Sequence, residues 1–394
     1  MYPKEHHVKQ VLKQHQIDVL LAQSPENYTY VSGESSHQHT VSRQPGFACA
    51  LVFAKDVKTI LIGMDFETPS FNHKSFDVYS FSTWVGNRTL QEIKQIEQTK
   101  PFVTMMDQIV AVIKKHQLTN ASIGLELDYL PTTFYLQLKD SFPDANFVNV
   151  SPLFIDLRII KQPDEIAFMK QLITISDGAL SYTSRFVKEG MSERELFDIY
   201  CIKVMESQLA FPSGWSSFTA GVNAGKLGRS SNAIIQPQDV VKFDGGVNGD
   251  TSFYTTDFSR SWLMSDVDPW LVRIKKNLMD AHKMMLEACK PGVTFKDLFV
   301  IGFEYTKKEF PFYTRGHLGH GISMGPQTAE PPFISASQEG ILKPNMILSL
   351  ENPMYITGYN GFNIEDMILI TETGFELLTP KTPHWLPSES KYQK

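Results

Sequence analysis

Two stretches of the chain repeat one pattern: IIQPQDVVKFD at residues 234–244 and ILKPNMILSLE at residues 341–351. Each begins with apolar residues and a proline, continues as an apolar strand and ends on a carboxylate, Asp244 in the first copy and Glu351 in the second. The copies lie 107 residues apart. Repetition on this scale predicts two copies of one helix-and-strand unit, packed about a pseudo-twofold axis.

Other features recur at nearly the same offset. Residues 190–192 and 292–294 lie 102 positions apart, and in each case an acidic residue follows three positions later. Both segments are typical of a helix end followed by a capped helix start. Asp257 and Glu365 are 108 residues apart, so a second carboxylate of each half falls in register. The repeat therefore predicts that four carboxylates come together.

Four acids gathered in a core repel one another and lose hydration, and bound cations offset both costs. Any one of these acids alone is more typical of a cap or turn, and it is the joint pattern that favours a metal centre. His320 is the predicted imidazole ligand, because its two flanking glycines let the backbone approach a site closely. Oxygen ligands with one imidazole favour manganese, cobalt, zinc or iron over calcium. The predicted metal ligands are Asp244, Asp257, His320, Glu351 and Glu365.

Composition excludes several other classes of protein. The 394 residues are 42% hydrophobic and 20% charged, which is typical of a globular protein with two domains. Lys and Arg total 37 against 43 Asp and Glu, with no dense basic run, so nucleic acid is not an expected partner. The amino terminus lacks a signal-peptide pattern and no stretch is apolar enough to span a bilayer, so we expect a cytoplasmic protein with no membrane partner. Three scattered cysteines argue against a disulfide framework or a thiolate metal cluster.

The first part of the chain alternates strand and helix signals. Apolar runs predict strands or strand leads at residues 11–12, 19–21, 49–53, 59–62, 123–125 and 147–150. Helical spacing recurs over residues 102–113 and 134–138. We therefore predict an α/β domain over residues 1–155 and a second domain over residues 156–394. Residues 151–162 are interpreted as the connector, because Pro163 followed by two acids is a strong helix start.

These motifs together resemble the pita-bread metallohydrolase family, which includes methionine aminopeptidase, prolidase, Xaa-Pro aminopeptidase and creatinase. Residues 17–21 and 25–33 resemble the creatinase-type amino-terminal domain, and residues 157–161 with 165–166 resemble its junction with the catalytic domain. The metal-ligand motifs correspond to residues 244–246, 256–260, 319–322, 350–353 and 364–366. The resemblance implies an α/β creatinase-like domain followed by an α+β pita-bread catalytic domain with an internal pseudo-twofold repeat.

The resemblance also implies roles for the five ligands. Asp257 and Glu365 would bridge two divalent metal ions, with Asp244 on one ion and His320 and Glu351 on the other. A metal-bridging hydroxide would attack a C–N amide bond, and Glu351 would accept the proton. Manganese is the expected metal, with cobalt, zinc or iron as alternatives. The implied activity is that of an Xaa-Pro peptidase of the prolidase or aminopeptidase P type, acting on a small peptide or peptide-like amide as a homodimer.

Three positions around the expected site depart from the family pattern. Residues 226–229 lack an expected histidine, Gln327 stands where a second histidine is expected, and Asn363 replaces an arginine. The predicted catalytic residues are Glu351, His317 and Gln327, and the predicted substrate-binding residues are Arg229 and Asn363. Trp84 and Trp215 are assigned to packing rather than to a substrate cage.

These departures leave two alternative functions open. One is a family member with non-peptide chemistry, such as a creatinase-like or ectoine-type hydrolase, or a lyase of the dimethylsulfoniopropionate kind. The other is a non-catalytic binding protein that keeps the fold. The retained metal ligands argue against creatinase chemistry, which works without metals. They also argue against a binding protein, which has no need of buried acids.

Overall fold

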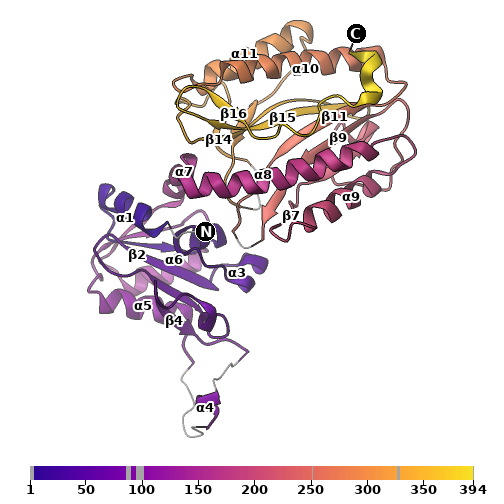
Figure 1. Cartoon of the computed structure of the whole chain (residues 1–394). Coiled ribbons are helices and arrows are strands. Elements are labelled where there is room, and N and C mark those ends of the chain that lie inside the picture. Colours follow the sequence, from indigo (N-terminus) through magenta and orange to yellow (C-terminus); the bar gives the residue numbers. More distant parts are fainter. Residues whose placement is uncertain (1–3, 86–89, 95–101, 251, 326–328, 394) are drawn as a thin grey trace. The chain divides into compact units, whose positions relative to one another are not determined.

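The chain forms two compact units, Met1–Leu157 and Arg158–Lys394 (Figure 1). The computed structural model describes residues 4–85, 90–94, 102–250, 252–325 and 329–393. Each unit has its own sheet and its own buried apolar core. No helix among the described residues is long and apolar enough to cross a membrane.

The first unit is built on a six-stranded mixed sheet with the strand order β4-β3-β2-β1-β5-β6. Its strands are β1 Val19–Ala22, β2 Ala48–Phe53, β3 Ile60–Met64, β4 Asp77–Phe81, β5 Ser122–Leu125 and β6 Asn146–Asn149. Its helices are α1 Glu5–Gln14, α2 Pro25–Ser32, α3 His37–Ser42, α4 Leu90–Lys94, α5 Met105–Lys115 and α6 Thr132–Ser141, and α7 Ser151–Ile159 begins in this unit and ends two residues into the second. The predicted α/β character of this part of the chain is confirmed.

Three segments of this unit differ from the sequence-based interpretation. Residues 11–12, read as a strand lead, lie in α1, where Val8 and Leu12 are buried one turn apart. Residues 151–159, read as a connector, form the helix α7. The sequence does not predict β4, because only Phe81 of its five side chains is buried and the strand carries no apolar run.

The second unit is built on an antiparallel eight-stranded sheet with the order β13-β12-β14-β15-β11-β9-β8, and β16 pairs with β15. These strands are β8 Ser217–Ala220, β9 Val240–Gly245, β11 Phe258–Leu263, β12 Gly319–Gly321, β13 Glu330–Phe333, β14 Ile347–Ile356, β15 Asn360–Ile370 and β16 Phe375–Leu377. A separate two-stranded sheet pairs β7 Ala210–Pro212 with β10 Val247–Gly249. The sheet lies between the pair α8 Pro163–Thr183 and α9 Glu193–Met205 and the pair α10 Pro269–Ala288 and α11 Phe295–Glu309 (Figure 1).

Three predicted helix starts are confirmed. Pro163 occupies the first turn of α8, where its missing N–H has no intrahelical partner to lose. Ser192 is the N-cap of α9 and Thr294 is the N-cap of α11, and each side chain accepts a hydrogen bond from the backbone N–H three residues later. The two caps occupy equivalent positions of the repeat.

The two halves of this unit also repeat the same backbone hydrogen bonds. The N–H of Gly190 donates to the carbonyl of Ile235 at 3.0 Å, and the N–H of Gly292 donates to the carbonyl of Leu342 at 2.9 Å. Both glycines have positive φ, +84° and +91°, which L side chains rarely adopt. Each half therefore anchors a helix start to the segment leading into its acid-bearing strand in the same way.

Strand register places the acids of the two halves in one row. Ser259 of β11 pairs with Asp244 of β9 on one side and with Glu365 of β15 on the other. Glu365 in turn pairs with Glu351 of β14. Residues directly opposite one another project from the same face of a sheet, so the three carboxylates converge. The sequence analysis placed Glu351 at the end of its strand. This was wrong, because β14 continues past Pro353 to Ile356.

One buried imidazole of the first unit is expected to affect stability. His39 is 1% exposed, and its Nε2 lies 3.3 Å from the Tyr129 hydroxyl. Its ring packs edge-on against Tyr28 at 6.1 Å between centroids. Burial, helped by the charge of Arg43, lowers the pKa of His39 from 6.5 to about 4. The folded protein therefore holds His39 neutral where the unfolded chain would bind a proton.

We predict that His39 destabilises the fold as pH falls from about 6.5 towards 4. In that window the unfolded chain binds a proton that the folded chain does not, which costs about 2 kcal/mol at pH 5 relative to pH 8. His39→Gln should therefore lose less stability over this range than the wild type. Denaturant unfolding at several pH values measures this. Parallel pH profiles for the two proteins would contradict the assignment.

Candidate metal centre

Three side chains from three segments meet at the row of acids. Asp257 directly precedes β11, His320 lies in β12 and Glu365 lies in β15, and one potential ligand atom from each is within 4.8 Å of the others. His320 Nε2 is 3.8 Å from Asp257 Oδ2 and 3.8 Å from Glu365 Oε1. All three residues are buried. One imidazole with carboxylates is a donor set that suits a first-row divalent ion.

The orientation of His320 leaves one ring nitrogen for an ion. Its Nδ1 lies 3.1 Å from the carbonyl oxygen of Gly321, which can only accept a hydrogen bond. Nδ1 therefore carries the ring proton, and Nε2 presents its lone pair to the carboxylates. Burial lowers the pKa of His320, which also favours the neutral ring that binds metal.

Glu365 is under electrostatic stress when no ion is bound. Burial raises the pKa of its carboxyl well above the usual range, and Asp257, Glu351 and Asp244 raise it further. Its Oε1 is buried and has no hydrogen-bond partner among the described residues. A cation would relieve both the repulsion and the missing contact, so the residues present fit a bound metal ion.

The other two predicted ligands contact protein cations. Glu351 Oε1 lies 3.1 Å from His317 Nδ1 and 3.2 Å from Arg315 Nη2. Burial would raise the pKa of Glu351, but His317 and Arg315 lower it below its usual value, so this carboxylate stays ionised. Asp244 Oδ2 lies 3.7 Å from Lys242 Nζ, and burial raises the pKa of Asp244 despite that ammonium.

The acids form part of the wall of a cavity of about 420 Å³. Charged and polar side chains line the wall, and Trp215, Leu227 and Tyr355 supply apolar surface. Trp215 was assigned to packing in the core or at the surface, and it is 55% exposed and borders the cavity, so its position is at the surface. This volume is within the range of small-molecule sites.

The residues predicted to contact substrate lie in different places. Asn363 borders the cavity, where its Nδ2 donates to Glu365 Oε2 at 3.1 Å and lies 3.4 Å from Glu351 Oε2. Arg229 lines a different pocket, beside Pro212, and is exposed. Gln327 lies outside the described residues.

Sequence reasoning missed Lys242 and Arg315, which both border the cavity. Lys242 lies within the run interpreted as an apolar strand, two residues before Asp244. Side chains alternate along a strand, so that spacing puts both on one face and could have identified the lysine. Arg315 lies in a loop before β12, and no periodic signal places it beside Glu351.

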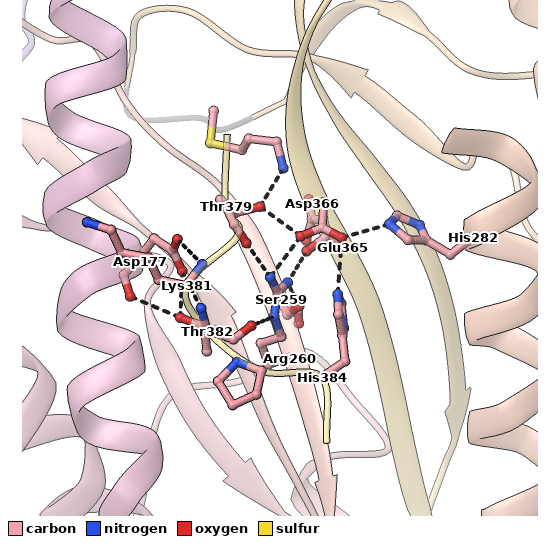
Figure 2. Close-up of polar contacts among 12 residues, drawn as sticks. Asp177, Ser259, Arg260, His282, Glu365, Asp366, Thr379, Lys381, Thr382 and His384 are labelled. Atoms are coloured by element: carbon pink, nitrogen blue, oxygen red, sulfur yellow. Dashed lines mark hydrogen bonds and ion pairs between the residues drawn. The ribbon is translucent and has the colours of Figure 1, made fainter. Parts of the chain in front are cut away.

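A second buried cluster supports the strand that carries Glu365 (Figure 2). The Arg260 guanidinium donates to Asp366 Oδ1 at 2.8 Å and to the backbone carbonyl of Glu365 at 2.6 Å. His282 Nε2 and His384 Nε2 lie 3.0 Å and 3.1 Å from Asp366 Oδ2. Burial would raise the pKa of Asp366, but Arg260 and the two histidines hold it well below its usual range. The cluster ties β11 to β15 directly behind the metal ligands.

Comparison with known families matches both units. The profile of Metallopeptidase family M24 matches residues 167–372, and that of the Creatinase/Prolidase N-terminal domain matches residues 6–160. An Xaa-Pro dipeptidase of Lactobacillus helveticus is 30% identical over 277 residues, which cover 68% of this chain and 73% of that protein. An Xaa-Pro dipeptidase of Pyrococcus furiosus is 29% identical, over 73% of this chain and 81% of that protein.

Solved structures share the fold over almost the whole chain. The structure of an Xaa-Pro dipeptidase from Bacillus anthracis has a TM-score of 0.79 at 21% identity and covers 97% of this chain and 99% of that one. An X-Pro aminopeptidase from Thermotoga maritima has a TM-score of 0.78 at 20% identity, with coverage of 98% and 100%. The predicted combination of a creatinase-like domain and a pita-bread domain is confirmed.

Glu365→Gln is predicted to prevent tight metal binding and to stabilise the metal-free protein. A carboxyl whose pKa is raised in the fold destabilises it above the unfolded value, so the gain should be present at neutral pH and disappear in acid. Equilibrium dialysis against Mn²⁺ with elemental analysis, together with thermal melts of chelator-treated protein, measures both effects. The matched control is Glu376→Gln, which removes an exposed carboxylate paired with Lys170. Undiminished metal binding by Glu365→Gln would exclude this residue as a ligand.

Arg260→Met is predicted to lower the free energy of unfolding by about 3–5 kcal/mol, because it leaves Asp366 buried without its main cation. Arg273→Met is the control, since Arg273 forms an exposed pair with Glu309 and should change stability by less than about 1 kcal/mol. Urea unfolding of the two variants gives the comparison. Equal losses in both would show that the cluster adds nothing to stability.

Proposed function

This chain belongs to metallopeptidase family M24, and we propose that it is a metal-dependent Xaa-Pro peptidase acting on small peptides. The observation that carries the proposal is the buried group Asp257, His320 and Glu365 on the wall of an open cavity. Relatives named Xaa-Pro dipeptidase match more than two thirds of the chain, 68% and 73% in the two cases above. Family and site chemistry therefore agree.

We propose a centre for two divalent ions. Asp257, His320 and Glu365 would hold an ion between them, and Asp244 and Glu351 would complete the ligand set. Bound ions would lower the pKa of a water molecule and polarise the scissile carbonyl. Manganese is the proposed metal, with cobalt, zinc or iron as alternatives of similar ligand preference.

Glu351 and His317 are the proposed proton carriers. Glu351 is held ionised by its neighbours, so it can accept a proton from the attacking water. His317 Nδ1 is 3.1 Å from Glu351 Oε1, within reach of that proton. We propose that His317 passes this proton to the leaving amine. Arg315 keeps Glu351 in place through its own contact at 3.2 Å.

The cavity wall suggests how a proline-containing peptide binds. Trp215, Leu227 and Tyr355 offer apolar surface to a proline ring. Asn363 hydrogen-bonds Glu365, so we propose that it orients the ligands as well as bordering the substrate. The proposed substrate contacts of Arg229 and the catalytic role of Gln327 rest on the resemblance alone.

Three further proposals rest on sequence and family resemblance. The protein would act as a homodimer and would reside in the cytoplasm. Its catalytic domain would begin at residue 156.

The decisive assay uses Mn²⁺-loaded protein with Xaa-Pro dipeptides and longer Xaa-Pro peptides. We predict turnover that falls about 100-fold or more in Glu351→Ala, because the proton acceptor and a ligand are lost together. Glu339→Ala changes the same residue type at an exposed position and should keep wild-type activity.

Other outcomes of the assay separate the alternatives. Stoichiometric metal without turnover of any Xaa-Pro peptide would favour a family member with non-peptide chemistry. Protein that binds no metal would favour a non-catalytic binding protein.

A further inference from the structure

Lys242 lies in a second row of side chains, next to the row of acids. It is two residues before Asp244 in β9, and Asn363 is two residues before Glu365 in β15, so both project from the face that carries the acids. Ser261 of β11 lies between them, because it pairs with Lys242 in register and its hydroxyl accepts from the N–H of Asn363 at 3.0 Å. Lys242 and Asn363 both border the cavity. The cavity wall therefore carries a cation beside its carboxylates.

The Lys242 ammonium is buried and incompletely hydrogen-bonded. The residue is 1% exposed. Its Nζ lies 3.7 Å from Asp244 Oδ2 and donates to the backbone carbonyl of Lys226 at 3.4 Å. Both distances are longer than the roughly 2.7–3.2 Å of an ordinary hydrogen bond from nitrogen to oxygen. An ammonium has three N–H donors, so its contacts among the described residues leave it capacity to bind an anion in the cavity.

The ring of Tyr355 borders the cavity and lies next to two cations. Lys242 Nζ is 4.3 Å from the ring centroid, and Arg315 Cζ is 5.9 Å from it. Arg315 also contacts Glu351 at 3.2 Å, so part of its guanidinium is already engaged. In proline the carboxyl carbon is bonded directly to a ring atom. A proline ring packed on Tyr355 would therefore bring its carboxylate close to the Lys242 ammonium.

The charge of the proposed centre also favours an anionic substrate. Two divalent ions would balance the four negative charges of its carboxylates, Asp244, Asp257, Glu351 and Glu365. Lys242 and Arg315, which contact two of these acids, then leave two excess positive charges in the cavity wall. The attacking water, even after it loses a proton, removes at most one of them. Excess charge away from water is costly, and a carboxylate of the substrate would reduce that cost.

We propose that Lys242 binds a carboxylate of the substrate and makes the cavity select peptides that carry one beside the scissile bond. This inference rests on the proposed function for the identity of the reaction. The carboxylate has two possible sources, which are the free carboxy terminus of a dipeptide that ends in proline and an acidic side chain on the residue before proline. A charge-assisted hydrogen bond to a buried ammonium should favour the charged peptide by roughly 10-fold or more.

The test compares pairs of peptides that differ in one carboxylate. Ala-Pro and Ala-Pro-amide test the carboxy terminus, and Glu-Pro-amide and Gln-Pro-amide test the side chain. We expect Mn²⁺-loaded wild-type protein to cleave the charged member of one pair with a kcat/KM roughly 10-fold or more above that of its neutral partner. Absence of a preference in both pairs would overturn the proposal.

Lys242→Met removes the ammonium and keeps a long side chain. It should abolish the preference, mainly through a higher KM for the charged peptide, because the carboxylate is bound before and during the reaction alike. A variant that only damaged the fold or the metal ligands would slow both peptides of a pair equally and leave their ratio unchanged. The pair that loses its preference identifies the source of the carboxylate. A preference that survives in Lys242→Met would also overturn the proposal.

Lys226→Met is the matched control, because the Lys226 side chain is exposed and lies outside the cavity lining. It should keep the wild-type preference. Elemental analysis and thermal melts establish that each variant holds metal and is folded, and Lys242→Gln provides a second neutral replacement if Lys242→Met does not fold.

The same four peptides test the inference without catalysis. Isothermal titration calorimetry gives their dissociation constants for any protein that does not cleave them. A charge preference in binding that disappears in Lys242→Met, without cleavage of any Xaa-Pro peptide, would refute the proposed activity and leave the role of Lys242 intact. Cleavage with the same preference in wild type and Lys242→Met would refute the role of Lys242 and leave the activity intact.

Discussion

The second unit depends on the placement of several carboxylates in one row beneath the surface. Asp244, Glu351 and Glu365 lie at the same level of the sheet on β9, β14 and β15, and Asp257 joins them from the residue before β11, the strand between β9 and β15. Such an arrangement is unfavourable without positive charge nearby, because burial and mutual repulsion both oppose ionisation. The residues around the row reduce this cost by placing positive charge or hydrogen-bond donors beside the carboxylates.

Side chains of the protein stabilise two of these four carboxylates. Arg315 and His317 stabilise Glu351, Lys242 stabilises Asp244, and the remaining pair, Asp257 and Glu365, is left facing the lone pair of His320. Behind the row, the guanidinium of Arg260 pairs with Asp366, the next residue along β15 after Glu365, and links β11 to β15. The charge that the protein does not itself supply is the charge that a metal ion would bring.

Much of the fold and of the row of acids could be predicted from periodic features of the sequence. The offset between residues 234–244 and 341–351 predicts the row of acids, because equivalent residues of a repeat occupy equivalent strands. Side chains that are positioned by loops carry no periodic signal and could not be found this way, and Arg315 is the main example. Lys242 was missed for another reason. A single polar residue in an apolar run has no evident role until Asp244, two residues later on the same face, is recognised as a ligand. Helix α7 was missed because residues 151–159 lack a clear apolar face.

The equivalent backbone hydrogen bonds made by Gly190 and Gly292 show that the two halves of the second unit share the same local structure. Yet the halves contribute different donors: the first brings Asp244 and Asp257, and the second brings His320, Glu351 and Glu365. Neither half alone can assemble the complete ligand set. Coordination of the full centre is therefore linked thermodynamically to the docking of the two halves, so an ion would favour the assembled unit over any partly folded chain.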